Sequence, residues 1–170
     1  MGTLQIHPGM KIKTSKKFWQ AAALGTLAGM RTMAAPVIAN QILTRHPSGH
    51  LSKSNLDFMQ SERLSVVLKL FGLAELVSDK LPFTPARTKA AGVIARCVSG
   101  SLAGASIYKA KGNNALAGAT VGAITALCAT YGCYLLRKSI GKNSCIPDAL
   151  TGGIEDLLVI GGGLALINNY

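Results

Sequence analysis

The chain has 170 residues, of which 49% are hydrophobic and only 15% are charged. Soluble domains average about 25% charged residues, so the composition disfavours an ordinary soluble domain. The charge is basic, with 18 Lys and Arg against 7 Asp and Glu, a net +11. A nucleic-acid binder would carry such a charge on a polar body with aromatic side chains, but aromatic residues make up 5% and the basic residues lie between apolar runs. We therefore expect a membrane protein that contacts the lipid bilayer and not nucleic acid.

The first part of the chain predicts a basic arm followed by a membrane span. Residues 1–17 are polar and form an N-terminal arm with Lys11, Lys13, Lys16 and Lys17. Residues 18–43 are apolar with one charge, Arg31, and exceed the ~20 residues that a spanning helix needs. A cleaved signal peptide is the alternative for this region, but Arg31 just before the small residues Ala34-Ala35 counts against it. Residues 44–61 contain proline, glycine and several serines and predict a loop.

Four apolar segments follow. Residues 64–81 contain Lys69, Glu75 and Asp79 and form either a short span that faces a polar interior or a helix in the membrane interface. The other three segments are 90–108, 115–136 and 149–167. No alternation typical of strands is present. We predict an all-α, polytopic transmembrane bundle of four to five helices, with residues 18–170 as a single transmembrane domain.

The distribution of basic residues predicts the orientation, because Lys and Arg near span ends prefer the cytoplasm. Five spans with the N-terminus inside place ten of these residues inside and five outside. The ten are Lys11, Lys13, Lys16, Lys17, Lys80, Arg87, Lys89, Arg137, Lys138 and Lys142, and the five are Arg45, Lys53, Arg63, Lys109 and Lys111. We expect a bacterial inner-membrane protein with a cytoplasmic N-terminus and an external C-terminus; the later helices invert if residues 64–81 do not span. Acidic pairs near the second and last spans also suggest a weak inverted repeat of the transporter kind.

Three spans carry pairs of glycines four residues apart, and all six are predicted to pack helices. The pairs are Gly25 with Gly29, Gly100 with Gly104 and Gly118 with Gly122. Lipid gives helices no hydrophobic reason to associate, so close approach through small residues must supply the contact. The partner is either another helix of the chain or a second copy, and we expect a homo-oligomer.

Seven charged residues fall inside the predicted spans, where charges persist only when they are paired or face water. Three are basic and four are acidic: Arg31, Lys69, Arg96, Glu75, Asp79, Glu155 and Asp156. Glu75 and Asp79 are four residues apart and share one helix face. This near balance predicts internal pairing, and the set forms either a polar path or binding site, or ion pairs that lock the bundle. Lys69 fits the structural alternative best, because a long side chain near a span end reaches the interface.

Other chemistry is sparse. His46 and His50 have zinc-like spacing, but Pro47 and Gly49 interrupt the helix that would align them and no third ligand is near. No nucleotide-binding glycine motif and no nucleophile with a nearby histidine is present. We therefore expect no metal, no cofactor and no catalytic residue, and an enzyme is the less favoured class.

Three segments carry a resemblance to a known family. They are Gly29-Met30-Arg31-Thr32-x-x-Ala35-Pro36, then Glu75-Leu-x-x-Asp79-Lys-Leu-Pro-x-Thr-Pro85-x-Arg87-Thr88, then Arg96-x-x-x-Gly100-x-x-x-Gly104 together with Glu155-Asp156. With them the chain resembles, over about residues 18–167, a bacterial family of small integral membrane proteins classified as a domain of unknown function. The resemblance implies a membrane location and brings no substrate or catalytic residues.

The leading hypothesis is a membrane transporter or channel for a small solute or ion. Its path would use the buried charges and one arginine beside them: Arg31, Glu75, Asp79, Arg87, Arg96, Glu155 and Asp156. One alternative is a membrane enzyme acting on lipid or isoprenoid phosphate, with Asp79, Arg87 and Arg96 near the headgroups. The other is a non-catalytic assembly or scaffold protein in which the charges only lock helices.

Overall fold

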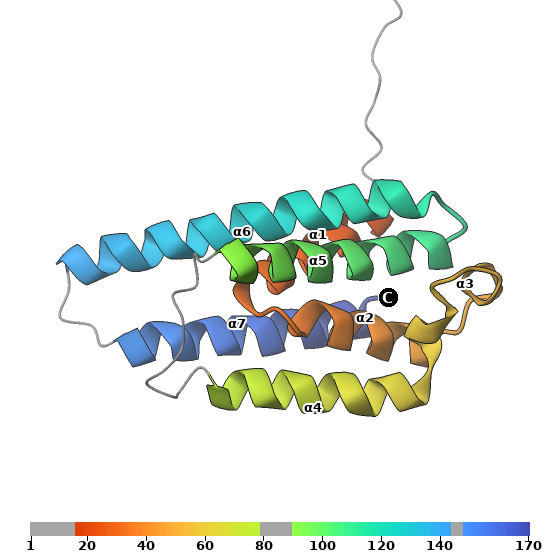
Figure 1. The fold of residues 1–170 in the computed structure, drawn as a ribbon, viewed down its shortest axis with the longest axis horizontal. Helices are drawn as coiled ribbons and strands as arrows, with labels where there is room; N and C mark the ends of the chain where they lie inside the picture. The colour runs from red at the N-terminus through yellow and green to blue at the C-terminus, as the bar shows by residue number, and fades with distance from the viewer. Residues whose placement is uncertain (1–15, 79–89, 144–147) are drawn as a thin grey trace, which may run out of the picture.

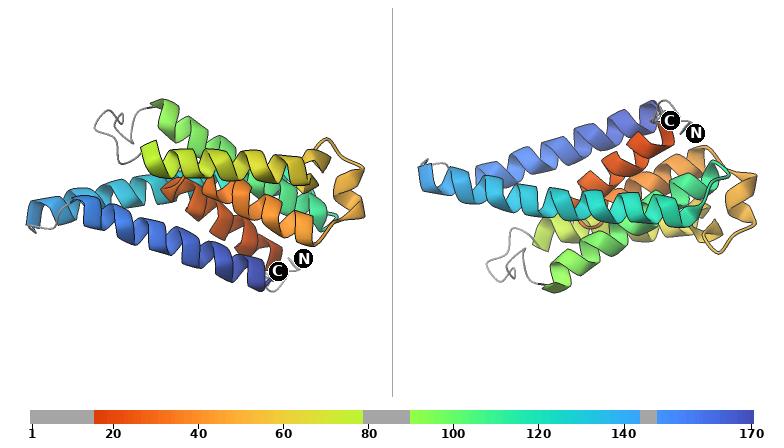
Figure 2. Two further views of the ribbon diagram at one scale, coloured as in Figure 1. Left: turned by 90° about the horizontal axis from the view of Figure 1, so that it is seen from below. Right: turned by 90° about the horizontal axis from the view of Figure 1, so that it is seen from above.

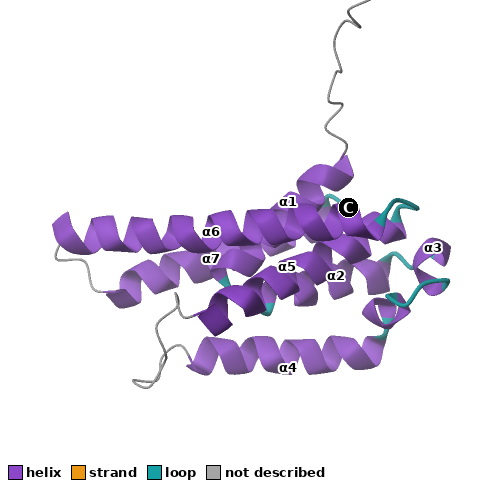
Figure 3. Ribbon diagram, turned by 45° about the horizontal axis from the view of Figure 1, so that its top comes forward, coloured by secondary structure: helices purple, strands orange, loops and turns teal. Residues whose placement is uncertain are grey.

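A computed structural model of the chain describes residues 16–78, 90–143 and 148–170. These contain seven α-helices and one 3-10 helix and, within those ranges, no strand, so the all-α prediction is confirmed (Figures 1 and 3). The helices are α1 (Lys16–Met30), α2 (Ala34–Arg45), α3 (Gly49–Ser52), η1 (Asp57–Gln60), α4 (Glu62–Ser78), α5 (Ala90–Ala110), α6 (Ala115–Asn143) and α7 (Asp148–Asn168). Most of the predicted N-terminal arm lies outside the described residues; Lys16 and Lys17 begin α1.

The single span predicted over residues 18–43 is wrong, because this segment forms a helical hairpin. α1 ends at Met30, and α2 begins at Ala34 and returns beside it (Figure 1). Pro36 gives the physical reason: inside one continuous helix it would lack an amide donor and its ring would clash with the carbonyl of Thr32. In the first turn of a new helix neither problem arises.

The helices form a bundle with α1, α5 and α6 at one side and α4 at the other. α1, α5 and α6 pack closely on one another, α2 lies against α5 and α4, and α7 lies against α1 and α2 (Figures 1 and 2). α6 continues without interruption, whereas α1 and α2 are separate helices. In the predicted inverted repeat, the segment 18–43 of the first half corresponds to α6 of the second half. The first segment is broken into two helices and α6 is not, so the two halves differ at this point.

The start of α1 and the C-terminus lie at the same end of the bundle (Figure 2). Lys111, in the turn between α5 and α6, connects them: its amino group donates to Gln20 of α1 and lies 4.4 Å from the centre of the Tyr170 ring. Five full-length spans would place these two parts of the chain at opposite ends of the bundle, whereas the hairpin brings them to one end. The cytoplasmic N-terminus and the external C-terminus stay predictions.

Among the described residues, two helices are long and apolar enough, by length and composition, to cross a membrane: α5 and the segment Ala115–Leu136 of α6. The other two long apolar helices in the described ranges are α4, with 17 residues, and α7. α5 and α6 give weak support to a membrane protein, and the prediction of four to five spans is not established by them.

The predicted glycine pairs lie where α1, α5 and α6 approach most closely. A Cβ atom on Gly100 would lie 2.6 Å from the carbonyl oxygen of Gly122, and one on Gly104 would meet the carbonyl oxygen of Gly118. Gly25 faces Gly122, and a Cβ on Gly29 would lie 2.5 Å from the carbonyl oxygen of Ala126. All these contacts join helices of one chain, so the pairs account for the bundle without a second copy.

Candidate functional site at the α1–α2 break

Arg31 occupies the break between α1 and α2 and is only 6% exposed. Its Nη2 lies 2.5 Å from Oδ1 of Asp156, and its Nε donates to the same oxygen at 2.8 Å. Asp156 belongs to α7. The pair therefore joins the hairpin to the last helix, as a charge-assisted contact in a buried setting.

Glu75 of α4 binds the backbone at the same break. One of its carboxylate oxygens accepts the N–H of Thr32 and the other accepts the N–H of Met33, both at 2.8 Å. α2 has no side-chain cap of its own at Met33, so its first amide groups would otherwise lack partners. A carboxylate here also meets the positive end of the helix dipole. Glu75 is thus a cap supplied from a neighbouring helix.

The break lies deep in the bundle. The hydroxyl of Ser99 donates to the carbonyl oxygen of Thr32, and Ser99 is the tenth of the 21 residues of α5. If α5 crosses a membrane, irregular backbone here lies near mid-depth, which is tolerated only where protein surrounds it. Asp156, Glu75 and Ser99 from three helices provide that surrounding.

The remaining predicted path residues are distributed as follows. Arg96 on α5 and Glu155 on α7 are buried, at 8% and 7% exposed, and Arg96 lies one helical turn before Ser99. Asp79 and Arg87 lie outside the described residues. The structure therefore gathers Arg31, Glu75 and Asp156 at one point and buries Arg96 and Glu155 within the same bundle.

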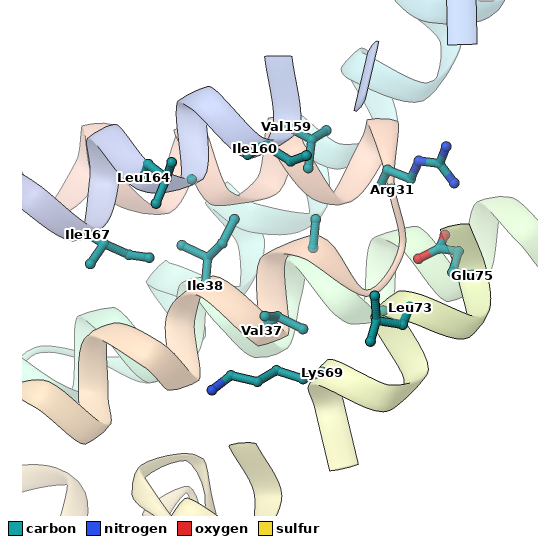
Figure 4. A pocket seen from close by; sticks show the side chains of 13 residues that line it. Arg31, Val37, Ile38, Lys69, Leu73, Glu75, Val159, Ile160, Leu164 and Ile167 are labelled. Atoms are coloured by element: carbon teal, nitrogen blue, oxygen red, sulfur yellow. The ribbon is translucent and has the colours of Figure 1, made fainter. Parts of the chain in front are cut away.

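A groove of about 450 Å³ adjoins the break between α2, α4 and α7. Figure 4 shows Arg31 and Glu75 at one end of it, with the amino group of Lys69 pointing the opposite way. Apolar side chains form the rest of its walls: Ala34, Val37, Ile38, Leu73, Val159, Ile160, Leu164 and Ile167. A charged centre thus lies next to a groove with apolar walls.

Replacing Glu75 by Gln tests the remote cap. A Gln side chain can accept through one oxygen only and turns its NH₂ group toward the second amide. We expect Glu75→Gln to lower the free energy of unfolding by about 1–2 kcal/mol, measured by SDS titration in mixed micelles with circular dichroism. The exposed carboxylate of Glu62 on the same helix provides the control, and Glu62→Gln should cost less than about 0.5 kcal/mol. Equal losses in the two variants would contradict the cap.

A second polar cluster lies at the end of the bundle where the chain finishes. Burial lowers the pKa of Lys111 from its ordinary 10.5, and the nearby charges of Lys16 and Lys17 lower this pKa further. Burial raises the pKa of Tyr170 above 10.0. Lys17 donates to Oδ1 of Asn113 at 2.5 Å, which brings the two lysines of α1 beside the α5–α6 turn.

The lowered pKa of Lys111 predicts how stability depends on pH. Between that pKa and 10.5 the unfolded chain binds more protons than the folded one, so the free energy of unfolding rises with pH in this window. We expect the melting temperature to rise from neutral pH toward pH 10 more in the wild type than in Lys111→Met. Lys53→Met, at an exposed lysine, controls for the loss of one charge and should keep the wild-type slope. The raised pKa of Tyr170 acts oppositely, but only above 10.0. A slope shared by the wild type and Lys111→Met would contradict the role of Lys111.

Several partners at the break carry no distinctive sequence signal. Thr32 and Met33 take part through their backbone, and Ser99 is one of several serines in apolar surroundings. Pro36 is the available signal, since it marks the first turn of a helix and so the break before it. The two histidines lie apart from the break: the His46 ring is 5.5 Å from the Tyr170 ring, and His50 lies beside Gly112.

Comparison with known proteins gives one family match. Searches of curated proteins and of solved structures each found no match. A protein family described as a domain of unknown function, DUF4126, matches residues 19–169. That match takes in the hairpin and every other described helix of the bundle. The chain belongs to the DUF4126 family.

Proposed function

We propose that this protein is an integral membrane transporter for a small anionic solute, with its binding site at the α1–α2 break. The observation that carries the proposal is the carboxylate of Glu75 on the amides of Thr32 and Met33. Amide groups at the start of a helix bind anions, and transporters use interrupted helices in this way near the middle of the membrane. Glu75 holds the position that the carboxylate of a substrate would take.

The surface of the bundle supports the membrane location. Large apolar side chains are exposed along four helices, far beyond the patches that soluble monomers present. They are Val66, Val67, Leu70, Phe71 and Leu73 on α4, Ile94 and Val98 on α5, Leu116, Ile124, Leu127, Leu135 and Leu136 on α6, and Ile154, Leu157, Leu158, Ile160 and Leu164 on α7. Lipid is the surroundings in which such a surface is stable.

Arg31 gives the site its second anion-binding group. Its guanidinium pairs with Asp156, and α4, which carries Glu75, lies at the periphery of the bundle (Figure 1). A movement of α4 away from α2 would release two amide groups next to Arg31. The proposed cycle therefore exchanges an internal carboxylate for an external anion, and the pairing of Arg31 with Asp156 keeps the cationic group in place.

Flux in proteoliposomes tests the proposal. The double variant Arg31→Gln/Asp156→Asn removes both charges together, so the fold keeps no unpaired member of this pair. With acetate and chloride as probes, we expect flux in the wild type and a loss of at least about tenfold in the double variant, because a charge-assisted hydrogen bond contributes ~1.5–3 kcal/mol. Arg63→Gln, at an exposed position, should keep wild-type flux. Equal flux in the double variant and the wild type would overturn the proposal.

A scaffold role is the second candidate, and one observation favours it. Arg31 and Glu75 both have partners within the chain, as charges that only lock helices would have. That role predicts no flux of either probe in the wild type, whereas the destabilisation of Arg31→Gln is expected under both candidates. No described contact favours an enzyme acting on lipid or isoprenoid phosphate, since Asp79 and Arg87 lie outside the described residues.

A further inference from the structure

The faces of α2 and α4 that meet beside α7 change in character along their length. On α2 the lining residues recur at helical spacing, and so do those on α4, so each helix presents one continuous stripe. The α2 stripe is Ala34, Val37, Ile38, Gln41, Thr44 and Arg45, and the α4 stripe is Glu62, Ser65, Val66, Lys69, Gly72 and Leu73. α2 starts at the break and α4 runs toward it, so Arg45 and Glu62 lie together at the end far from the break, here called the outer end. Both stripes are polar at this outer end and apolar toward the break.

Two hollows lie along these stripes and meet at Lys69. The apolar groove of about 450 Å³ lies toward the break, and a polar recess of about 350 Å³ lies toward the outer end, lined by Arg45, Glu62 and Lys69 among others. Along the apolar groove, from Lys69 to Glu75, α4 rises roughly 9 Å at 1.5 Å per residue. The groove therefore takes the part of an acyl chain nearest the head, with the polar head at the recess.

The charges of the recess favour a negatively charged head. Arg45 and Lys69 carry two positive charges and Glu62 one negative charge, which leaves an excess of one positive charge. Among the described residues, Lys69 has no hydrogen bond or ion pair for its amino group, although it lines the apolar groove as well. In lipid such a cation is stabilised by water at the interface or by an anionic partner. The Lys69 side chain points toward the outer end, where an anionic head would lie, and away from Glu75 (Figure 4).

We propose that the α2–α4 groove binds an acidic phospholipid, with one acyl chain between Val37, Leu73 and Ile160 and the phosphate between Arg45 and Lys69. The proposal rests on the membrane location proposed above and not on transport. A free anion would use only the recess and would leave the apolar groove unfilled, whereas a phospholipid fills both hollows.

Native mass spectrometry of the full chain in detergent tests this site, with phosphatidylglycerol and phosphatidylcholine as probes. We expect the wild type to bind phosphatidylglycerol about fivefold more tightly or better, the ratio that ~1 kcal/mol for a basic residue near the lipid surface gives. Lys69→Gln should remove that preference, whereas Lys53→Gln, at an exposed lysine outside the groove, should retain it. Excess inorganic phosphate should displace neither lipid.

A second variant tests the acyl chain. A Cβ on Gly72 would meet only Cγ2 of Val37, at 3.6 Å, so Gly72→Phe places its ring in the groove without moving backbone. We expect this variant to lose binding of both lipids at the site, while Gly132→Phe, where a Cβ meets nothing within 4 Å, binds as the wild type does.

Three results would overturn the lipid site: equal affinity for the two lipids, a preference that survives Lys69→Gln, or displacement by phosphate. Each would leave the membrane location standing if the protein sediments with membranes. Recovery of the chain in the soluble fraction without detergent would instead contradict the membrane location itself. Flux of acetate or chloride is measured separately, so failure of transport is not confused with failure of lipid binding.

Discussion

Gly122→Ala is expected to separate the helices at the centre of the bundle. A Cβ at this position would meet the carbonyl oxygen of Gly100 closer than the 3.0 Å that real Cβ contacts respect, and Gly25 of α1 packs on the same turn. Backbone cannot rotate away as a flexible side chain can, so α5 and α6 must move apart. We expect a loss of about 1–3 kcal/mol or more in the free energy of unfolding, measured by SDS titration in mixed micelles.

Gly132→Ala is the matched control on the same helix. A Cβ there meets nothing within 4 Å, and replacing Gly by Ala inside a helix gains roughly 0.5–1 kcal/mol. The same substitution should therefore destabilise at one position of α6 and stabilise at another, ten residues later. Similar changes at Gly122 and Gly132 would contradict the close packing of α5 on α6.

The single variant Arg31→Gln is expected to destabilise the fold more than the double variant Arg31→Gln/Asp156→Asn does. The single variant leaves the carboxylate of Asp156 in a mostly buried position without the guanidinium that lies 2.5 Å away, and breaking a buried pair in this way costs about 3–5 kcal/mol. In Arg31→Gln/Asp156→Asn two neutral amides can bond to each other, so we expect much of that loss to be recovered.

A double-mutant cycle in the same micelles measures the effect. Residues in direct contact show interaction energies of about 0.5–3 kcal/mol, and we expect the upper part of that range because Arg31 is 6% exposed. Arg63→Gln, at an exposed position of α4, should change stability by less than about 0.5 kcal/mol. Additive losses for Arg31→Gln and Asp156→Asn would show that the pair is not energetically coupled.

The hydropathy of the sequence predicts most helices well, because long runs of apolar residues form helices that are removed from water. The segments 90–108, 115–136 and 149–167 correspond to α5, α6 and α7; α5 and α7 are each two residues longer than predicted, and α6 is seven residues longer. Gly100, Gly104, Gly118 and Gly122 were found for a similar reason: small residues at four-residue spacing occur where backbones approach.

The break between α1 and α2 escaped prediction because hydropathy averages over a window. Residues 18–43 are as apolar in a hairpin as in one helix, and a single proline hardly changes the average. Arg31 and Glu75 were identified as buried charges, but their partners could not be: Glu75 binds backbone amides, and Asp156 lies 125 residues from Arg31. Such pairing depends on tertiary structure, which local patterns do not encode.

The pairing of Arg31 with Asp156 also sets an order for the contacts at the break. α1 and α2 are synthesised before α7, so the guanidinium of Arg31 meets its partner only after a residue 125 positions later has been made. The amides of Thr32 and Met33 likewise meet their partner only after Glu75 has been made. The contacts at the break are therefore complete only once α7 has been added.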